Sequence, residues 1–139
     1  MLKRKVQTTI FYCDNERIKH FLLLKMNKKR GLYWQNVTGG VEKNEDFEEA
    51  ALREAKEETG LKKKNIKKLT YLDFEFQFHD QWGNDVLEKV YALEVAQPWD
   101  ILIDPSEHCE YKWVAETDIH PKIVHFETNF QAIKKVLQQ

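Results

Sequence analysis

GGVEKNEDFEEAALREAKEETGL, residues 39–61, combines a helical pattern with a high density of acidic side chains. Asn44 is the expected N-cap and Gly60 the expected left-handed residue after the last turn, which brackets a helix of about 15 residues. Within residues 45–58, seven acids stand against two bases. Composition alone therefore favours a solvated surface helix.

Helical phase divides these acids into two groups. At about 100° per residue, one apolar stripe comprises Phe47, Ala50, Ala51 and Ala55. Glu54, Glu57 and Glu58 fall on the same side of the helix, whereas Glu48 and Glu49 are expected to be solvated. The stripe thus begins with apolar side chains and ends with carboxylates.

Three carboxylates on a docking face need compensating positive charge. Unpaired buried charges would cost several kcal/mol. Arg53 can pair with Glu57 at i,i+4, but one arginine cannot neutralise three carboxylates. Hard divalent cations bind through oxygen ligands, and Mg²⁺ typically uses one or two carboxylates together with substrate phosphates and water. We therefore expect a metal site rather than a solvated surface.

The spacing of particular residues in this stretch is specific. The fixed positions are Gly39, Glu45, Arg53, Glu54, Glu57, Glu58 and Gly60, followed by Leu61. This spacing resembles the Nudix box. The resemblance implies an α/β protein, a Nudix-type α/β/α sandwich with a mixed β-sheet, and hydrolysis of a nucleoside diphosphate that is linked to another group.

The resemblance also implies roles for individual residues. Glu54 and Glu58 match metal ligands for Mg²⁺ or Mn²⁺, and Glu57 matches a further ligand or a ligand-orienting group. Arg53 matches the orienting arginine, and Glu45 a structural or outer ligand. The backbone carbonyl of Thr38 or Gly39 is a further candidate ligand.

Three flanking stretches resemble bacterial dihydroneopterin triphosphate and dATP pyrophosphohydrolases. They are YWQNVTGGVE (residues 33–42), EHCEYKWV (residues 107–114) and TNFQAI (residues 128–133). This resemblance makes Glu107 a candidate metal ligand or general base, the alternative being a loop glutamate beside Pro105.

The same resemblance implies substrate contacts from four positions, namely Lys3, Arg4, Thr38 and Asn129. Trp34 and Trp82 can stack on a base or pterin ring, although packing in the core or hairpin is an equal alternative.

Outside this stretch, alternating apolar residues indicate strands. Strands are expected over residues 6–12, 20–26, 69–79, 86–95 and 111–114, and a terminal helix over residues 129–137. Residues 81–85 are expected to form a hairpin turn between antiparallel strands, and residues 62–68 a solvated linker. The alternating Phe74, Phe76 and Phe78 are expected to face the core.

Composition limits the functional class. The 139 residues are 42% hydrophobic with a net charge of −1, which predicts one domain over residues 1–139 without a basic surface for duplex nucleic acid or an anionic membrane. Cys13 and Cys109 are isolated, which argues against disulfides or structural zinc. No apolar run approaches the roughly 20 residues of a membrane span. We expect a cytoplasmic monomer or homodimer.

The leading hypothesis is a Mg²⁺-dependent pyrophosphohydrolase that converts a nucleoside or pterin triphosphate to the monophosphate and pyrophosphate. Dinucleoside polyphosphates and nucleotide sugars such as ADP-ribose are alternative substrates, whereas the near-neutral charge argues against RNA. A non-catalytic nucleotide-sensing module would be expected to lack box carboxylates, and all are present. An isomerase of the isoprenoid type would need a catalytic cysteine, for which Cys13 and Cys109 are the candidates.

Overall fold

A computed structural model describes residues 2–139. Its strands are β1 (Leu2–Cys13), β2 (Lys19–Met26), β3 (Trp34–Gln35), β4 (Val37–Gly40), β5 (Ile66–His79), β6 (Asp85–Val95) and β7 (His108–Ala115). Its α-helices are α1 (Phe47–Thr59) and α2 (Glu127–Leu137). Short 3-10 helices are η1 (Lys28–Arg30), η2 (Lys63–Asn65), η3 (Glu116–Asp118) and η4 (Pro121–Ile123).

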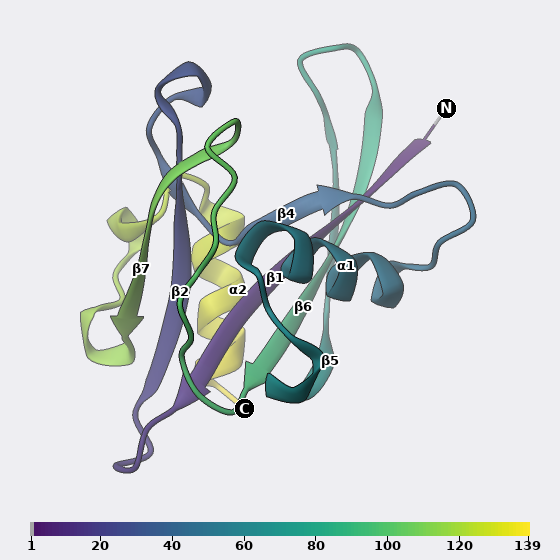
Figure 1. Cartoon of the computed structure of the whole chain (residues 1–139). Coiled ribbons are helices and arrows are strands. Elements are labelled where there is room, and N and C mark those ends of the chain that lie inside the picture. Colours follow the sequence, from purple (N-terminus) through teal and green to yellow (C-terminus); the bar gives the residue numbers. More distant parts are fainter. Residues whose placement is uncertain (1) are drawn as a thin grey trace.

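The strands form one mixed sheet (Figure 1) with the central order β3-β2-β1-β6-β5. Strands β1 and β6 are parallel, and the other described pairs are antiparallel. β1 pairs with β4 through residues 5–8 and with β2 through residues 11–13. The sheet therefore divides beside β1, and β4 lies where the two halves separate.

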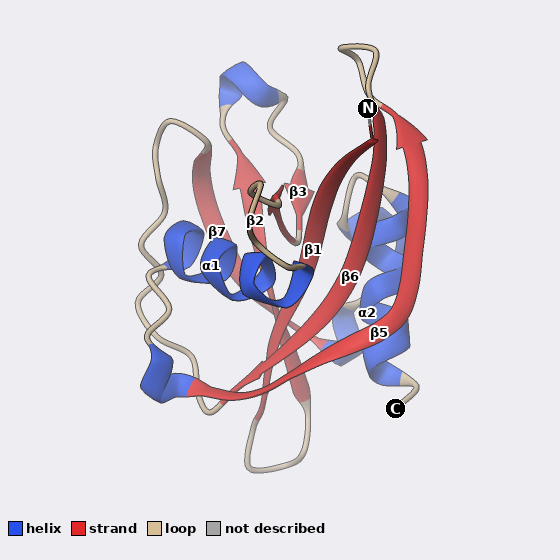
Figure 2. Cartoon of the chain, turned by 90° about the vertical axis from the view of Figure 1, so that its right-hand side faces the viewer, coloured by secondary structure: helices blue, strands red, loops and turns tan. Residues whose placement is uncertain are grey.

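Helices cover both faces of the sheet (Figure 2). On one face, Ala132, Ile133 and Val136 of α2 pack in a cluster with Phe21 and Val90. On the other face, the alanines of α1 join two clusters that include Val6 and Ile10 of β1. The alternation of β1 thus supplies apolar side chains to both layers, and the predicted α/β/α sandwich with a mixed sheet is confirmed.

Several boundaries differ from the predictions, among them β7, which begins at His108, and α2, which begins at Glu127. β5 begins at Ile66 because Ile66 packs against the α1-side core while the neighbouring lysines face solvent, so the predicted linker over residues 62–68 is wrong at its end. β1 begins at Leu2 because β6 pairs with it from that residue onward. The hairpin and the antiparallel pairing of β5 with β6 are confirmed.

The N-cap of α1 is Asp46 and not Asn44. The Asp46 carboxylate accepts a hydrogen bond from the Glu49 amide at 2.8 Å, and the Glu49 carboxylate accepts one from the Asp46 amide at 3.1 Å. This reciprocal capping box satisfies two amides that would otherwise lack partners. Gly60 ends the helix with a left-handed φ of 73°, as predicted.

Within residues 2–139, no helix is long and apolar enough to cross a membrane.

Candidate functional site

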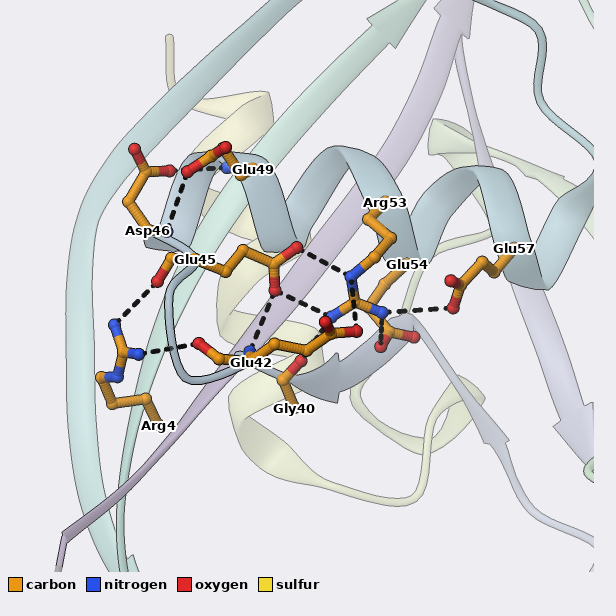
Figure 3. Close-up of polar contacts among 9 residues, drawn as sticks. All are labelled: Arg4, Gly40, Glu42, Glu45, Asp46, Glu49, Arg53, Glu54 and Glu57. Carbon is orange, nitrogen blue, oxygen red and sulfur yellow. Dashed lines mark hydrogen bonds and ion pairs between the residues drawn. The ribbon is translucent and has the colours of Figure 1, made fainter.

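Arg53 organises the polar side of α1 (Figure 3). Its Nε and Nη2 donate to the Glu45 carboxylate at 2.8 and 2.9 Å, and its Nη1 donates to Glu54 at 2.8 Å and Glu57 at 3.2 Å. Its Nη2 also donates to the Gly40 carbonyl at 2.7 Å. The hydrogen bonds from Arg53 lower the pKa of Glu45 to about 2. Arg53 therefore ties the helix to β4 and to the loop before the helix.

Glu54 lies against the backbone of β4. A Cβ atom on residue 39 would overlap the Cγ, Cδ and Oε1 atoms of Glu54, so only glycine fits there while Glu54 keeps its place. A Cβ on Gly40 would meet nothing within 4 Å. Neither glycine has a left-handed φ. Glycine is therefore required at residue 39 by the close approach of Glu54 and not by a left-handed backbone.

Glu58 is a carboxyl group buried in the last turn of α1. The residue is 7% exposed, and its Oε2 atom has no hydrogen-bond partner among the described residues. Burial, followed by the charges of Glu54 and Glu107, raises the pKa of Glu58 to about 9. Burial also raises the pKa of Glu54, against the opposing effect of Arg53. Ionisation of Glu54 and Glu58 in the folded protein therefore requires additional positive charge nearby.

The prediction that Glu57 faces the body of the protein is wrong. Its side chain is 59% exposed, whereas Glu58 beside it is buried. The reason is the phase of the helix, because the buried set extends to Thr59 and its centre lies roughly 120° around the axis from Glu57. The predicted ion pair between Arg53 and Glu57 is present. Glu48 and Glu49 are exposed, as predicted.

Glu107 approaches the same carboxylates from another element. It directly precedes β7, and pairing of β7 with β2 holds it beside the turn that contains η1, where the Asn27 amide donates to the Glu107 carbonyl at 2.9 Å. Arg30 Nη1 lies 3.5 Å from Glu107 Oε1. The charge of Glu107 contributes to the raised pKa values of Glu54 and Glu58.

These acids do not already enclose a cation position. Among residues 2–139, no three His, Cys, Asp or Glu side chains are gathered in the arrangement of a metal site. Arg53 engages Glu54 and Arg30 engages Glu107, so these guanidinium groups supply part of the compensating charge. Glu58 has no such partner in this part of the chain.

A cavity of about 940 Å³ lies on the α2 side of the sheet, and Glu54, Glu58 and Glu107 are not among its lining residues. Arg30 and Thr38 line it, and Thr38 directly precedes the glycine that contacts Glu54. Its opposite wall is aromatic, with Phe76, Phe78 and Trp82 from the hairpin of β5 and β6. The cavity thus has cationic and aromatic lining residues, and Arg30 and Thr38 connect it to the acidic residues.

Only some of the predicted substrate-binding residues meet at this cavity. Thr38 and Asn129 line it. Lys3 is exposed and outside it, and Arg4 donates to the carbonyls of Glu42 and Glu45 at 3.0 Å. Arg4 therefore supports the loop before α1.

The two tryptophans considered for stacking lie in different places. Trp34 packs against the α2-side core, with Lys112 Nζ 4.1 Å from its ring centroid, and does not line the cavity. Trp82 lines the cavity and is 73% exposed. Phe74 and Phe76 pack against the α2-side core, as expected, and Phe76 also lines the cavity. Phe78 lines the cavity, is only half-buried and does not belong to that core cluster, so the expectation is wrong for Phe78.

Several cavity residues were not anticipated from the sequence. Among them are Lys5, Gln35 and Glu88, of which Glu88 is buried. The sequence does contain a pattern that could have identified Glu88. It is a charged residue on the inward face of β6, two positions from the buried Val90.

Known proteins share this architecture. An RNA pyrophosphohydrolase of Novosphingobium aromaticivorans is 29% identical over 126 residues, covering 81% of this chain and 78% of that protein. An octanoyltransferase of Myxococcus xanthus is 31% identical over 98 residues, covering 67% of this chain, and the chain spans 26% of that relative's length.

A solved structure of E. coli dihydroneopterin triphosphate pyrophosphohydrolase superposes with a TM-score of 0.80. The match covers 98% of this chain and 96% of that one at 23% identity, so it supports the fold alone.

The family model described as NUDIX domain matches residues 3–136. This match extends over nearly the whole chain and includes the acidic helix and the strands around it. It confirms the resemblance drawn from the spacing within residues 39–61. The chain therefore belongs to the Nudix family of hydrolases, which act on pyrophosphate bonds and generally depend on divalent metal ions.

Proposed function

We propose that this Nudix hydrolase converts a nucleoside or pterin triphosphate to the monophosphate and pyrophosphate. The observation that carries the proposal is the buried carboxyl group of Glu58, whose Oε2 atom has no hydrogen-bond partner among the described residues, together with a large cavity that Arg30, Thr38 and aromatic side chains line. Such a substrate requires two features of the protein. Carboxylates must bind the cation that accompanies the phosphates, and a cavity must accommodate the planar ring.

The residues present fit a hard divalent cation. Glu58 Oε2 is a buried oxygen without a partner, and the surrounding side-chain donors are carboxylates, which suit Mg²⁺ or Mn²⁺. Glu54, Glu58 and Glu107 would hold the ion, with a carbonyl from Thr38 or Gly39. When bound, the metal supplies charge neutralisation on phosphoryl oxygens and lowers the pKa of a bound water.

The remaining roles belong to side chains. Arg53 holds Glu54 and fixes the loop through Glu45, so it is a positioning residue. Glu57 at the rim is a further ligand or orients one. Arg30 is placed to bind phosphate oxygens, since it lines the cavity and reaches Glu107.

In the reaction, water adds to a phosphorus atom and the phosphoanhydride P–O bond breaks. The carboxylate of Glu107 accepts the proton that the water loses. Pyrophosphate leaves from the Arg30 end of the cavity, and the monophosphate retains its ring at the aromatic wall.

The cavity supports a substrate with one ring system. Its volume of about 940 Å³ lies within the range of small-molecule sites. Thr38 and Asn129 add polar groups to the lining, which could bind a sugar or side chain of the substrate.

A substrate panel tests this proposal. Canonical nucleoside triphosphates, dihydroneopterin triphosphate, diadenosine polyphosphates, ADP-ribose and a 5′-triphosphorylated RNA are incubated with the protein and Mg²⁺, and pyrophosphate and orthophosphate are measured separately. The expected products are pyrophosphate and a monophosphate from a single-ring triphosphate. Turnover confined to another class, or binding without turnover, would overturn the proposal.

A further inference from the structure

A buried carboxyl group lies in the cavity away from the proposed chemistry. Glu88 of β6 is 5% exposed, lines the cavity, and stands opposite Lys5 of β1 and Phe76 of β5 in the sheet. A carboxyl group with so little solvent needs hydrogen-bond partners. Its Oε2 has one, because Gln7 Nε2 donates to it at 3.1 Å.

The orientation of Gln7 is fixed by a buried network. Asn36 Nδ2 donates to Gln7 Oε1 at 2.8 Å, and the Asn36 amide donates to Asn129 Oδ1 at 2.7 Å. Since the Gln7 oxygen faces an NH₂ group, the Gln7 NH₂ must face Glu88. The hydrogen bond from Gln7 therefore fixes the position of Glu88 Oε2.

The second oxygen of Glu88 is available to a ligand. Among residues 2–139, the hydrogen bond from Gln7 to Oε2 is the one found for the Glu88 carboxylate, and Lys5 acts on it through its charge and not through an ion pair. Burial raises the pKa of Glu88, whereas the Gln7 hydrogen bond and the Lys5 charge lower it. An acceptor oxygen that lines a cavity and lacks a donor can accept a hydrogen bond from an N–H group of a ligand.

Charge sets which part of a substrate meets Glu88. It is the one acidic side chain among the described cavity-lining residues, and Lys5, which also lines the cavity, offsets part of its charge. Lys29 and Arg30 contribute positive charge from the η1 turn. Phosphates are therefore attracted more strongly to the η1 turn, which contributes two cationic side chains, than to the surroundings of Glu88. The η1 turn and the β5–β6 hairpin stand apart in Figure 1, so the ring of the substrate lies at the hairpin end beside Phe76.

We propose that Glu88 is a specificity-determining residue that selects rings carrying an amino group, by accepting an N–H hydrogen bond at Oε1. The proposal rests on the function proposed above. An amino group donates to the carboxylate, whereas a ring carbonyl at the same position directs its lone pairs at another acceptor. Adenine, guanine, cytosine and pterin rings carry such a group, and hypoxanthine, xanthine and uracil carry a carbonyl in its place.

Matched substrate pairs test this inference. The kcat/KM values are compared from neutral to alkaline pH, because burial raises the pKa of Glu88, for triphosphates of adenine and hypoxanthine, guanine and xanthine, and cytosine and uracil. The wild type is expected to favour the amino member of its preferred pair by about 10- to 100-fold. Equal rates for both members of every pair would overturn the inference without any variant.

Glu88→Gln is the informative substitution, because the amide oxygen keeps an acceptor for the Gln7 NH₂ group and the amide NH₂ then presents a donor to the ring in place of an acceptor. The preference for the amino member is expected to be lost or reversed, mostly through KM, with the melting temperature kept. Glu94→Gln, on the same strand but paired with Lys67 outside the cavity, is the control and should keep the wild-type ratio. A Glu88→Gln variant with an unchanged ratio would overturn the inference.

Calorimetric titration with the matching monophosphates separates this inference from the proposed function. If the protein hydrolyses none of the triphosphates, the proposed function fails, yet the affinity ratio between amino and carbonyl monophosphates still reports on Glu88. A ratio near one in wild type contradicts the assignment, and a ratio that Glu88→Gln abolishes supports it.

Discussion

Glu58→Gln separates the stability cost of a buried carboxylate from its use as a metal ligand. The ordinary pKa of this carboxyl is 4.5, and burial next to Glu54 and Glu107 raises it to about 9 in the folded protein. A raised folded pKa means that the group favours folding fully below pH 4.5, and that this contribution is lost as the pH rises through 9. Glutamine imitates the protonated acid at every pH.

The loss of folding free energy can be calculated from the change in the pKa of Glu58 on folding. One pKa unit corresponds to about 1.4 kcal/mol, so about 4 kcal/mol of folding free energy is lost from the metal-free wild type between pH 5 and pH 8. For a chain of this length, that loss corresponds to a difference in melting temperature of about 10 °C or more. Glu58→Gln should be spared this loss, so the gap between variant and wild type should widen with pH.

Thermal unfolding in chelator and in millimolar Mg²⁺ measures both parts. In chelator, the Glu58→Gln variant should become progressively more stable than wild type from pH 5 to pH 8. In Mg²⁺, the wild type should recover stability at pH 8, because metal binding favours the ionised carboxylate. Glu48→Gln, an exposed glutamate of the same helix, should follow wild type throughout. A gap that does not change with pH, or equal stabilisation of both proteins by Mg²⁺, would refute the reasoning.

Two further predictions concern the surroundings of the carboxylates. Gly39→Ala should displace Glu54 and lower kcat by at least about 10-fold, whereas Gly40→Ala, whose Cβ meets open space, should keep it, and equal rates for the two would contradict the packing. Glu107→Gln should lower kcat by about 10² to 10⁴ with the melting temperature kept, while Glu110→Gln, which only breaks an ion pair with Lys25, should stay near wild type. A nearly wild-type rate for Glu107→Gln would exclude it as the general base.

The acidic helix was predictable because its information is local. The phase of α1 follows from spacing within a few turns, so the buried alanines and the solvated Glu48 and Glu49 are as predicted. The predicted start of the helix was wrong, because two residues near it are both suitable N-caps. Asn44 and Asp46 are both good N-caps, and the reciprocal bond with Glu49 favours Asp46.

The approach of Glu107 to Glu58 was not derivable from spacing. No periodicity links two positions so far apart. The pairing of β7 with β2 places Glu107 beside the η1 turn, and its charge contributes to the raised pKa of Glu58. A family resemblance suggested Glu107. Residue spacing does not distinguish Arg30, which pairs with Glu107, from the neighbouring lysines of η1.

The cavity was the least predictable part of the site. Gln7, Asn36 and Glu88 are single polar residues within apolar or mixed segments, and their partners come from different strands. Trp34 was predicted to face either substrate or core, and long-range packing against the α2-side cluster decides for the core. Such a network can be predicted only when the order of the strands in the sheet is known, and the spacing of residues in the sequence does not reveal that order.

Glu54→Gln tests the central claim most directly, because Glu54 contacts both Arg53 and the backbone of Gly39 at the proposed metal site. Pyrophosphate release is measured with and without Mg²⁺ for wild type, Glu54→Gln and the exposed control Glu48→Gln. We predict that Glu54→Gln lowers Mg²⁺-dependent kcat by about 100-fold or more while Glu48→Gln keeps it. A Glu54→Gln variant with wild-type Mg²⁺-dependent turnover would show that the acidic face of α1 is not the site of hydrolysis.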